Sequence, residues 1–203
     1  MSKAKRYLRV WEWRLAYRRR ALARAKKAHN GKRVEYLRRK VRYAQKRVDF
    51  WRKRALPMRL RALDVAESLV GVMEIGGNNQ GPMVSKIIRA NGGTGPEPWC
   101  GDFVAYCYQR AGSKAVTRSW AAVRLLGSVV GVKRVQKPLA GDLVRFTFDH
   151  VGMFVRDQGA FIETIEGNTG ASGAVSDSAT GGDGVYRKRR PKSQVNDYLR
   201  VTR

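Results

Sequence analysis

Positive charge is concentrated in the first sixty residues of this chain. Residues 1–60 contain 23 lysines and arginines and three acidic residues, a formal charge of +20. The rest of the chain contains 19 lysines and arginines and 13 acidic residues, a formal charge of +6. Glycine has the opposite distribution, because Gly31 is the only glycine before Gly71. Self-repulsion among many like charges destabilises a compact fold. The sequence therefore predicts two parts, a basic one over residues 1–56 and a glycine-rich one over residues 57–203.

Apolar residues in the basic part recur at alternating spacings of three and four, the period of paired helices. Arg18 occupies one of these positions in the first half. Asn30 and Gly31 lie between the halves and suit a helix C-cap and a tight turn. Two helices joined by a short turn run antiparallel, so we predict a basic antiparallel α-helical hairpin with a narrow apolar seam. The seam residues are Leu8, Trp11, Leu15, Leu22, Ala25, Val34, Leu37, Val41, Ala44, Val48, Trp51 and Ala55.

The single sign of this charge predicts an anionic partner, since a merely solvated helix face normally mixes both signs. Nucleic acid, an anionic membrane surface and a cell-wall polymer all fit. No apolar run reaches the ~18 residues of a membrane span. Residues 1–10 lack the apolar core of a secretory signal, so we expect neither a span nor a signal peptide. Aromatic side chains that could stack on sugars or bases, or lie at a lipid interface, are Tyr7, Trp11, Trp13, Tyr17, Tyr36 and Tyr43, although Trp11 suits the seam better.

The glycine-rich part changes its pattern halfway along. Helical spacing of apolar residues comes first, and short β-branched and aromatic segments broken by Gly and Asp follow. Helices followed by an antiparallel sheet constitute an α+β fold. The predicted helices cover residues 60–73, 83–90, 103–110 and 120–126, and the predicted strands cover 143–148, 150–156, 160–165, 185–189 and 198–202.

The two cysteines have different predicted surroundings. Seven residues of helix separate Cys100 from Cys107 by about 10 Å, beyond the ~7 Å that a disulfide allows, so we expect no bridge. Cys107 lies on an apolar helix face and suits a small buried hydrophobe. Cys100 lies where a proline-broken loop becomes a helix, and the helix N-terminus favours the thiolate, which is the nucleophile. The N–H groups there could also form an oxyanion hole.

A thiol nucleophile needs a base, and the chain has two histidines. His29 lies in the turn of the basic part, whereas His150 begins a predicted strand. The residue that orients the base would come from the neighbouring strand, at whose end Glu166 and Asn168 lie. Being two apart, these residues would face the same side of that strand. Alone, Cys100 would be read as a passive thiol, and His150 equally well as a structural histidine or as a base. Together with Glu166 or Asn168, they predict the residues of a cysteine hydrolase.

At these residues the chain resembles CHAP domains, which are papain-like cysteine amidases and peptidases that cut peptidoglycan and are common in bacteriophage endolysins. The resemblance covers roughly residues 62–190 and does not extend to residues 1–56. An upstream segment is also similar to the one that precedes the nucleophile in phage-type members. The stretches that carry the resemblance are WCGDFV at 99–104, PLAGDLV at 138–144, HVG at 150–152, EGN at 166–168 and, upstream, EIGGNNQG at 74–81.

The resemblance implies a role for each candidate residue. Cys100 would be the nucleophile and His150 the general base and acid. Glu166 would orient His150, and Asn168 would assist there or polarise the carbonyl. Some CHAP lysins bind calcium through an acidic loop before the nucleophile, but residues 91–97 are poor in carboxylates. We therefore expect an enzyme without metal or cofactor, in which Asp102 is a first-turn helix residue and not a ligand.

These observations favour a phage-type peptidoglycan hydrolase. The Cys100 thiolate would attack an amide of the stem peptide or cross-bridge, and water would hydrolyse the thioester. Residues 1–56 would hold the enzyme on an anionic envelope polymer or membrane, and nonspecific nucleic-acid binding is also expected. Without a signal, the protein would stay in the host cytoplasm until a holin-like pore let it reach the cell wall. The alternatives are a cysteine protease acting on protein, and a virion-associated or nucleic-acid-binding structural protein with an incidental CHAP-like domain.

Overall fold

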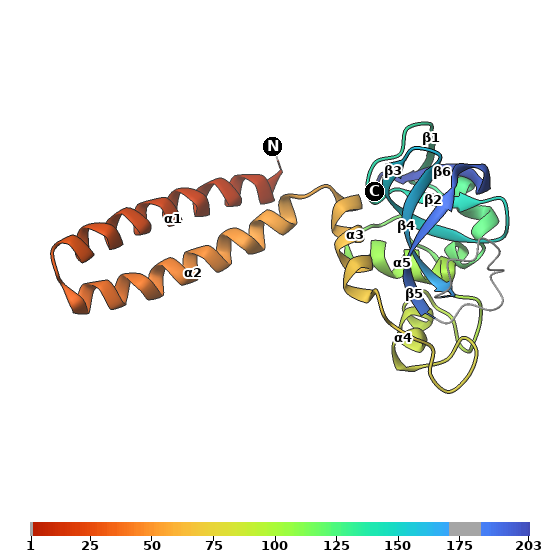
Figure 1. The fold of residues 1–203 in the computed structure, drawn as a ribbon, viewed down its shortest axis with the longest axis horizontal. Helices are drawn as coiled ribbons and strands as arrows, with labels where there is room; N and C mark the ends of the chain where they lie inside the picture. Colours follow the sequence, from red (N-terminus) through yellow and green to blue (C-terminus); the bar gives the residue numbers. More distant parts are fainter. Residues whose placement is uncertain (1, 171–183) are drawn as a thin grey trace. The chain divides into compact units, whose positions relative to one another are not determined.

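The chain folds as two units, Met1–Pro57 and Met58–Arg203, each with its own core. The computed structural model describes residues 2–170 and 184–203 (Figure 1). None of the helices formed by these residues combines the length and the apolar content that crossing a lipid bilayer requires.

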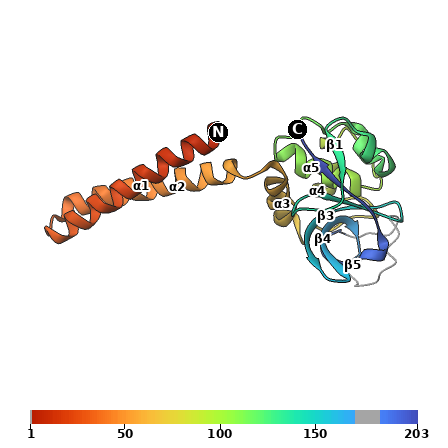
Figure 2. The same cartoon turned by 90° about the horizontal axis from the view of Figure 1, so that it is seen from above.

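The first unit is a helical hairpin, in which α1 (Lys3–Lys27) lies beside α2 (Gly31–Ala55) (Figures 1 and 2). Ser2 caps the first helix by accepting a hydrogen bond from the Lys5 N–H. Arg18 is accommodated at the seam position because its guanidinium donates to the Lys40 carbonyl of the facing helix, at 3.2 Å. The buried cluster of the seam is Trp11, Leu15, Ala44 and Val48, with Leu8, Val41 and Trp51 packed against it.

The turn of the hairpin differs from the expectation, which assigned the helix C-cap and the tight turn to Asn30 and Gly31. The residue in the left-handed conformation is a different one. His29 has φ +50°, and Gly31 is already the first residue of α2. The His29 N–H donates to the Lys26 carbonyl and the Asn30 N–H to the Ala25 carbonyl, which is the Schellman pattern of a helix C-terminus. The Asn30 side chain then accepts from the Arg33 N–H at 3.0 Å. Asn30 is therefore an N-cap for the second helix, and a histidine holds the position that glycine usually takes.

We expect His29→Gly to stabilise the hairpin by about 0.5–1 kcal/mol, because glycine adopts positive φ without the steric cost that a Cβ imposes. Thermal unfolding followed by circular dichroism at 222 nm measures the effect. His29→Ala is the matched control, since it removes the imidazole and keeps the Cβ. A glycine variant that melts no higher than the alanine variant would contradict the backbone explanation.

In the second unit, helices precede the sheet along the chain. The predicted helix over 60–73 ends earlier, at Leu69, where a turn begins. The predicted helix over 120–126 is instead a pair of 3₁₀ turns, within which Trp120 is fully buried and donates its indole N–H to the Ala115 carbonyl. The helical elements are α3 (Met58–Leu69), α4 (Pro82–Ala90), α5 (Cys100–Arg110), η1 (Arg118–Ala121), η2 (Val123–Ser128) and η3 (Lys192–Gln194).

The strands of the described residues form one antiparallel sheet of six, in the order β1-β6-β2-β3-β4-β5. The α+β prediction is therefore confirmed. The sequence missed β1, a four-residue edge strand with partly exposed residues. The strands are β1 (Val132–Val135), β2 (Leu143–Phe146), β3 (Val151–Gln158), β4 (Phe161–Thr169), β5 (Gly184–Pro191) and β6 (Val195–Val201).

The sheet separates two apolar clusters because neighbouring residues of a strand face opposite sides. The larger cluster lies on the helix side, where α5 contacts β3 and β4 (Figure 1). In β2, Leu143 belongs to this cluster and Val144 to the other one. The smaller cluster consists of Val144, Phe146, Phe154 and Ile162. Helix α5 is thus held against the middle of the sheet, with its N-terminus at the end where His150 begins its strand.

Candidate active site

Cys100 is the first residue of α5, and its side chain is 3% exposed. The N-cap position, Trp99, offers no side-chain hydrogen bond to the helix, so the first turn keeps main-chain N–H groups for a ligand. The first turn packs closely on β4, because a Cβ on Gly167 would come within 2.8 Å of the Phe103 and Trp99 rings. Cys100 and Cys107 are both free thiols, as expected. Cys107 is fully buried, and burial raises the pKa of its thiol.

The upstream segment 74–81 contacts Trp99, the residue that precedes Cys100. One carboxylate oxygen of Glu74 accepts the Trp99 indole N–H at 2.9 Å. The other accepts the main-chain N–H of Asn79 at 2.8 Å. Trp99 is fully buried, so this contact fixes the loop at the start of α5. The segment therefore acts on the position of Cys100 through Trp99.

His150 lies immediately before β3 and is 1% exposed. Its ring stacks against Phe146 and Phe148, with centroids 5.7 and 5.9 Å away. Its Nε2 lies 3.0 Å from the Oε2 atom of Glu166, which is fully buried. Since an ionised carboxylate only accepts, Nε2 carries the proton in this hydrogen bond, and Nδ1 is left to face another group.

Cys100 lies close enough to His150 to interact with its ring. Burial alone would lower the pKa of His150, but interactions with Cys100 and Glu166 outweigh it and raise the pKa to about 9. The approach of thiol and imidazole falls short of a well-formed hydrogen bond, because Nδ1 has no partner of normal geometry within residues 2–170 and 184–203. Catalytic hydrogen bonds are often this loose before substrate binds. The structure therefore brings Cys100, His150 and Glu166 into one chain of interactions.

Glu166 is held by more than His150. The Arg190 guanidinium donates from Nε to Oε1 at 3.1 Å and from Nη2 to Oε2 at 2.6 Å. The Thr164 hydroxyl donates to Oε1. Burial alone would raise the pKa of Glu166, but hydrogen bonds and charges from His150 and Arg190 lower it to about 2. The carboxylate is therefore ionised throughout the physiological range.

Gly152 makes room for this carboxylate. A Cβ at Gly152 would lie 2.6 Å from Cγ of Glu166 and 3.3 Å from the Ile165 carbonyl oxygen. Such distances require the Glu166 side chain to move. The glycine of the His150-Val151-Gly152 stretch thus has a steric reason in the geometry of the site.

Asn168 was expected to face the same side of its strand as Glu166, which requires side chains to alternate regularly along the strand. The strand is irregular at Asn168. A β-bulge lies between Gly167 and Thr169, and Asn168 has φ +56°. A bulge adds a residue to one strand and so resets which side chains share a face. The hydroxyl of Thr169 accepts a hydrogen bond from Nη2 of Arg190 at 3.3 Å. Thr169 therefore joins the surroundings of Glu166, and Asn168, although buried, occupies the irregular position of the strand.

Asp102 is a first-turn residue of α5, as expected, and is fully buried. Its Oδ1 accepts from Asn91 at 2.6 Å and from Arg118 at 3.2 Å. Burial raises the pKa of Asp102 to about 6, against the effect of the Asn91 hydrogen bond. Arg118 also pairs with Glu97, so this network ties the loop before Cys100 to η1. Among the described residues, no three His, Cys, Asp or Glu side chains are grouped as a metal site would require.

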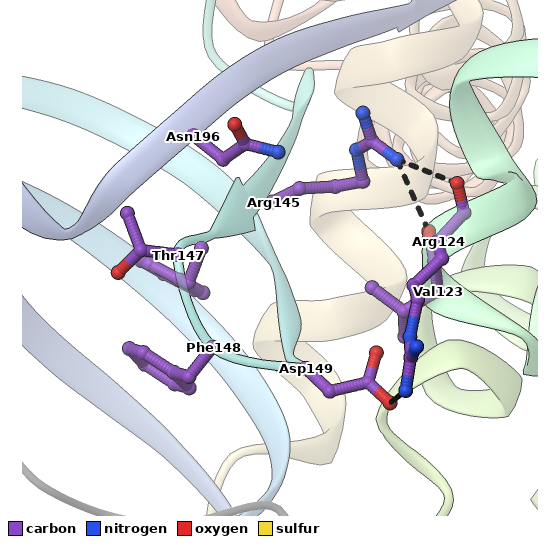
Figure 3. Close-up of a pocket in the computed structure, with 8 residues that line it drawn as sticks. Val123, Arg124, Arg145, Thr147, Phe148, Asp149 and Asn196 are labelled. Atoms are coloured by element: carbon purple, nitrogen blue, oxygen red, sulfur yellow. Dashed lines mark hydrogen bonds and ion pairs between the residues drawn. The ribbon is translucent and has the colours of Figure 1, made fainter.

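A pocket of about 300 Å³ adjoins the loop that carries His150 (Figure 3). Arg145 forms part of its wall and is fixed there, since Nη1 donates to the Arg124 carbonyl and Nη2 to Asp197. The exposed side chains of Arg124 and Asp149 form an ion pair at 3.7 Å beside it. The lining residues are Val123, Arg124, Arg145, Phe146, Thr147, Phe148, Asp149 and Asn196.

The sequence predicted the candidate residues that the structure brings together and missed the residues that support them. Cys100, His150 and Glu166 are brought together, and His29 belongs to the other unit. Arg190 and Thr164 were missed. Arg190 lies among four consecutive basic residues at 187–190, and nothing local marks it as the one that lies buried beside a carboxylate. Comparison of the chain with protein-family models, with curated proteins and with solved structures finds no match.

Proposed function

We propose that the unit Met58–Arg203 is a papain-like cysteine hydrolase of the CHAP type that cleaves an amide bond of bacterial peptidoglycan. The observation that carries the proposal is the buried chain from Cys100 through His150 to the ionised Glu166. A thiol at a helix N-terminus, a base and a group that orients the base are the components of nucleophilic acyl transfer. The ordered likeness to CHAP motifs supports peptidoglycan as the substrate class.

The first half of the reaction forms a thioester. With His150 protonated, the Cys100 thiolate attacks the amide carbon, and the carbonyl oxygen takes the negative charge. Main-chain N–H groups at the start of α5 would stabilise this oxyanion. As the tetrahedral intermediate collapses, the C–N bond breaks and His150 gives the Nδ1 proton to the leaving amine.

The second half hydrolyses the thioester. Neutral His150 accepts a proton from water at Nδ1 while the water oxygen attacks the acyl carbon. The C–S bond then breaks, the carboxylic acid leaves, and the thiolate–imidazolium pair is restored. Glu166 holds Nε2–H throughout, which fixes the tautomer and the orientation of the ring.

For the hairpin Met1–Pro57 we propose a targeting role on an anionic polymer or membrane of the cell envelope. The seam uses the buried apolar residues of both helices, and the three acids of residues 1–60 can neutralise few of the 23 cations. The charge therefore remains for an outside partner. Exposed aromatic side chains such as Trp13 and Tyr17, which stack on each other at 5.8 Å, add ring faces to this surface.

Loss of turbidity of purified cell walls tests the enzymatic proposal, together with chemical analysis of the released ends. We expect new amino and carboxyl termini and no new reducing sugar ends. The identity of the new amino-terminal residue tells an amidase from an endopeptidase. Walls that stay intact while a protein substrate is cut by the same thiol would favour a cysteine protease. Intact walls with no thiol-dependent cleavage of either substrate would contradict a hydrolase.

We expect a chain that begins at Met58 to cleave soluble wall fragments normally and to lyse intact cells poorly. The reason is that the hairpin holds no proposed catalytic residue and would act by raising the local enzyme concentration. Charge–charge contacts are screened over ~8 Å at physiological salt, so the advantage of the full-length protein should shrink as salt rises. Lysis rates of the two chains across a salt series measure this. Equal lysis by both chains at low salt would refute targeting.

A further inference from the structure

Arg190 is a buried cation that the proposed mechanism does not use. Its side chain is 1% exposed, and it lies on β5 two residues from the buried Lys188. Removing an arginine and a carboxylate from water is costly, and apolar residues of similar volume often give equal or greater stability. Stability alone is therefore a weak reason for an arginine at this place.

The contacts of Arg190 converge on the carboxylate that holds His150. Two guanidinium nitrogens donate hydrogen bonds to the two carboxylate oxygens of Glu166. Nη2 lies 2.6 Å from Oε2, the atom that also accepts from His150. The guanidinium also lies 5.4 and 5.6 Å from the ring centroids of Phe146 and Phe148. Those two rings stack on the imidazole of His150. Arg190 thus contacts Glu166, which binds Nε2 of His150, and both rings that stack on the imidazole.

We propose that Arg190 is a positioning residue, which keeps Glu166 ionised and aligned so that His150 presents Nδ1 to Cys100. This inference rests on the proposed role of His150 as the partner of the Cys100 thiolate. Arg190 would act through Glu166, which its guanidinium binds, and not directly on the thiol. A fork of two N–H groups suits this task better than a single ammonium, because it fixes the plane of the carboxylate.

The groups around Glu166 determine how the site responds to acid. His150 and Arg190 are the charged groups bound to it, Thr164 is the neutral donor, and Lys188 of β5 binds the Gly170 carbonyl. His150 and Arg190 both lower the pKa of Glu166 against the effect of burial, so without Arg190 this pKa would rise. Protonated Glu166 no longer stabilises the imidazolium, so the thiolate would lose its counter-ion at a higher pH than in the native protein.

The pH dependence of Cys100 alkylation by iodoacetamide tests this in the full-length protein, with the modified peptide quantified by mass spectrometry. We expect Arg190→Gln to move the acid limb of the alkylation rate upward by about one pH unit or more. We expect Arg190→Lys to leave the acid limb of the alkylation rate near its native pH, because lysine keeps a cation beside Glu166. We expect the same variant to lower the rate of wall cleavage by roughly 10-fold or more, because lysine lacks the paired N–H groups of the guanidinium. Arg189→Gln is the matched control, since Arg189 is exposed on the same strand, and it should leave both the limb and the rate unchanged.

A double-mutant cycle shows through which residue Arg190 acts. In a Glu166→Gln background, Arg190→Gln should shift the acid limb no further, because the group that it controls is already neutral. An unshifted limb in folded Arg190→Gln, or an equal further shift in the Glu166→Gln background, would overturn the proposal. If Arg190→Gln does not fold, an Arg190→Lys variant with native wall-cleavage and alkylation rates would also overturn it. Alkylation reports on Cys100 whether or not the walls are cut, so a shifted limb without wall cleavage would support the role of Arg190 and count against the proposed substrate.

Discussion

Replacing Cys100 with serine is expected to reduce wall cleavage by a factor of about 10⁴ or more while the fold stays intact. The serine hydroxyl does not ionise near neutral pH, so His150 would face a far weaker nucleophile than a thiolate. The side chain is 3% exposed and changes by one atom, so the packing of α5 on the sheet is retained. Turbidity loss of purified walls measures activity, and circular dichroism confirms folding.

Cys107→Ser is the matched control for this prediction. Cys107 is a free thiol on the same helix, is fully buried, and is one of the residues of the main core. The new hydroxyl would cost about 1–3 kcal/mol of stability at an apolar site, and cleavage should remain. A folded Cys107→Ser protein without activity, beside an active Cys100→Ser protein, would show that the nucleophile has been assigned to the wrong cysteine.

Replacing His150 with alanine is expected to reduce cleavage by roughly 10³-fold or more, since the residue supplies both proton transfers. In the native protein we expect the raised pKa of His150 to set the alkaline limit of wall cleavage. The proton that the leaving amine needs is lost as the pH rises through about 9. Rates of wall cleavage between pH 5 and about 10 measure this limb. His29→Ala is the control, because His29 lies in the turn of the hairpin, and it should cleave walls at the native rate. Native activity in His150→Ala would exclude the mechanism.

The raised pKa of His150 and the lowered pKa of Glu166 also affect the stability of the fold. The first contribution is lost at high pH and the second at low pH. The pKa of His150 rises from 6.5 to about 9 on folding, so its contribution to stability is complete below 6.5 and is lost as the pH rises through 9. The pKa of Glu166 falls from 4.5 to about 2, so its contribution is complete above 4.5 and is lost as the pH falls through 2. The buried pair therefore stabilises the fold most between pH 4.5 and 6.5.

The sequence predicted those parts of the fold that repeat along the chain. The alternation of threes and fours placed Trp11 and Val48 in the seam of the hairpin, where both are buried. The change from helical spacing to short β segments predicted the order of helices and strands. The proline-broken loop before Cys100 predicted that the chain becomes helical close to the thiol, and α5 begins at Cys100, three residues before the helix expected over 103–110. Each of these features depends on neighbours within a few residues, which is what a periodic pattern reports.

The surroundings of Glu166 were decided by tertiary structure. The register of β5 on β4 places Arg190 opposite Ile162, on the same face as Glu166, whose own partner is Tyr186, and the long arginine side chain then reaches the carboxylate. The bulge at Asn168, which brings Thr169 to Arg190, is equally invisible in a strand whose sequence alternates normally. Likewise β1, the first strand of the sheet along the chain, pairs with β6, the last. The sequence by itself determined the local elements and the candidate residues Cys100, His150 and Glu166. Only the pairing of distant strands decided which of several similar basic side chains lies buried against the carboxylate, because that choice depends on register and not on residue type.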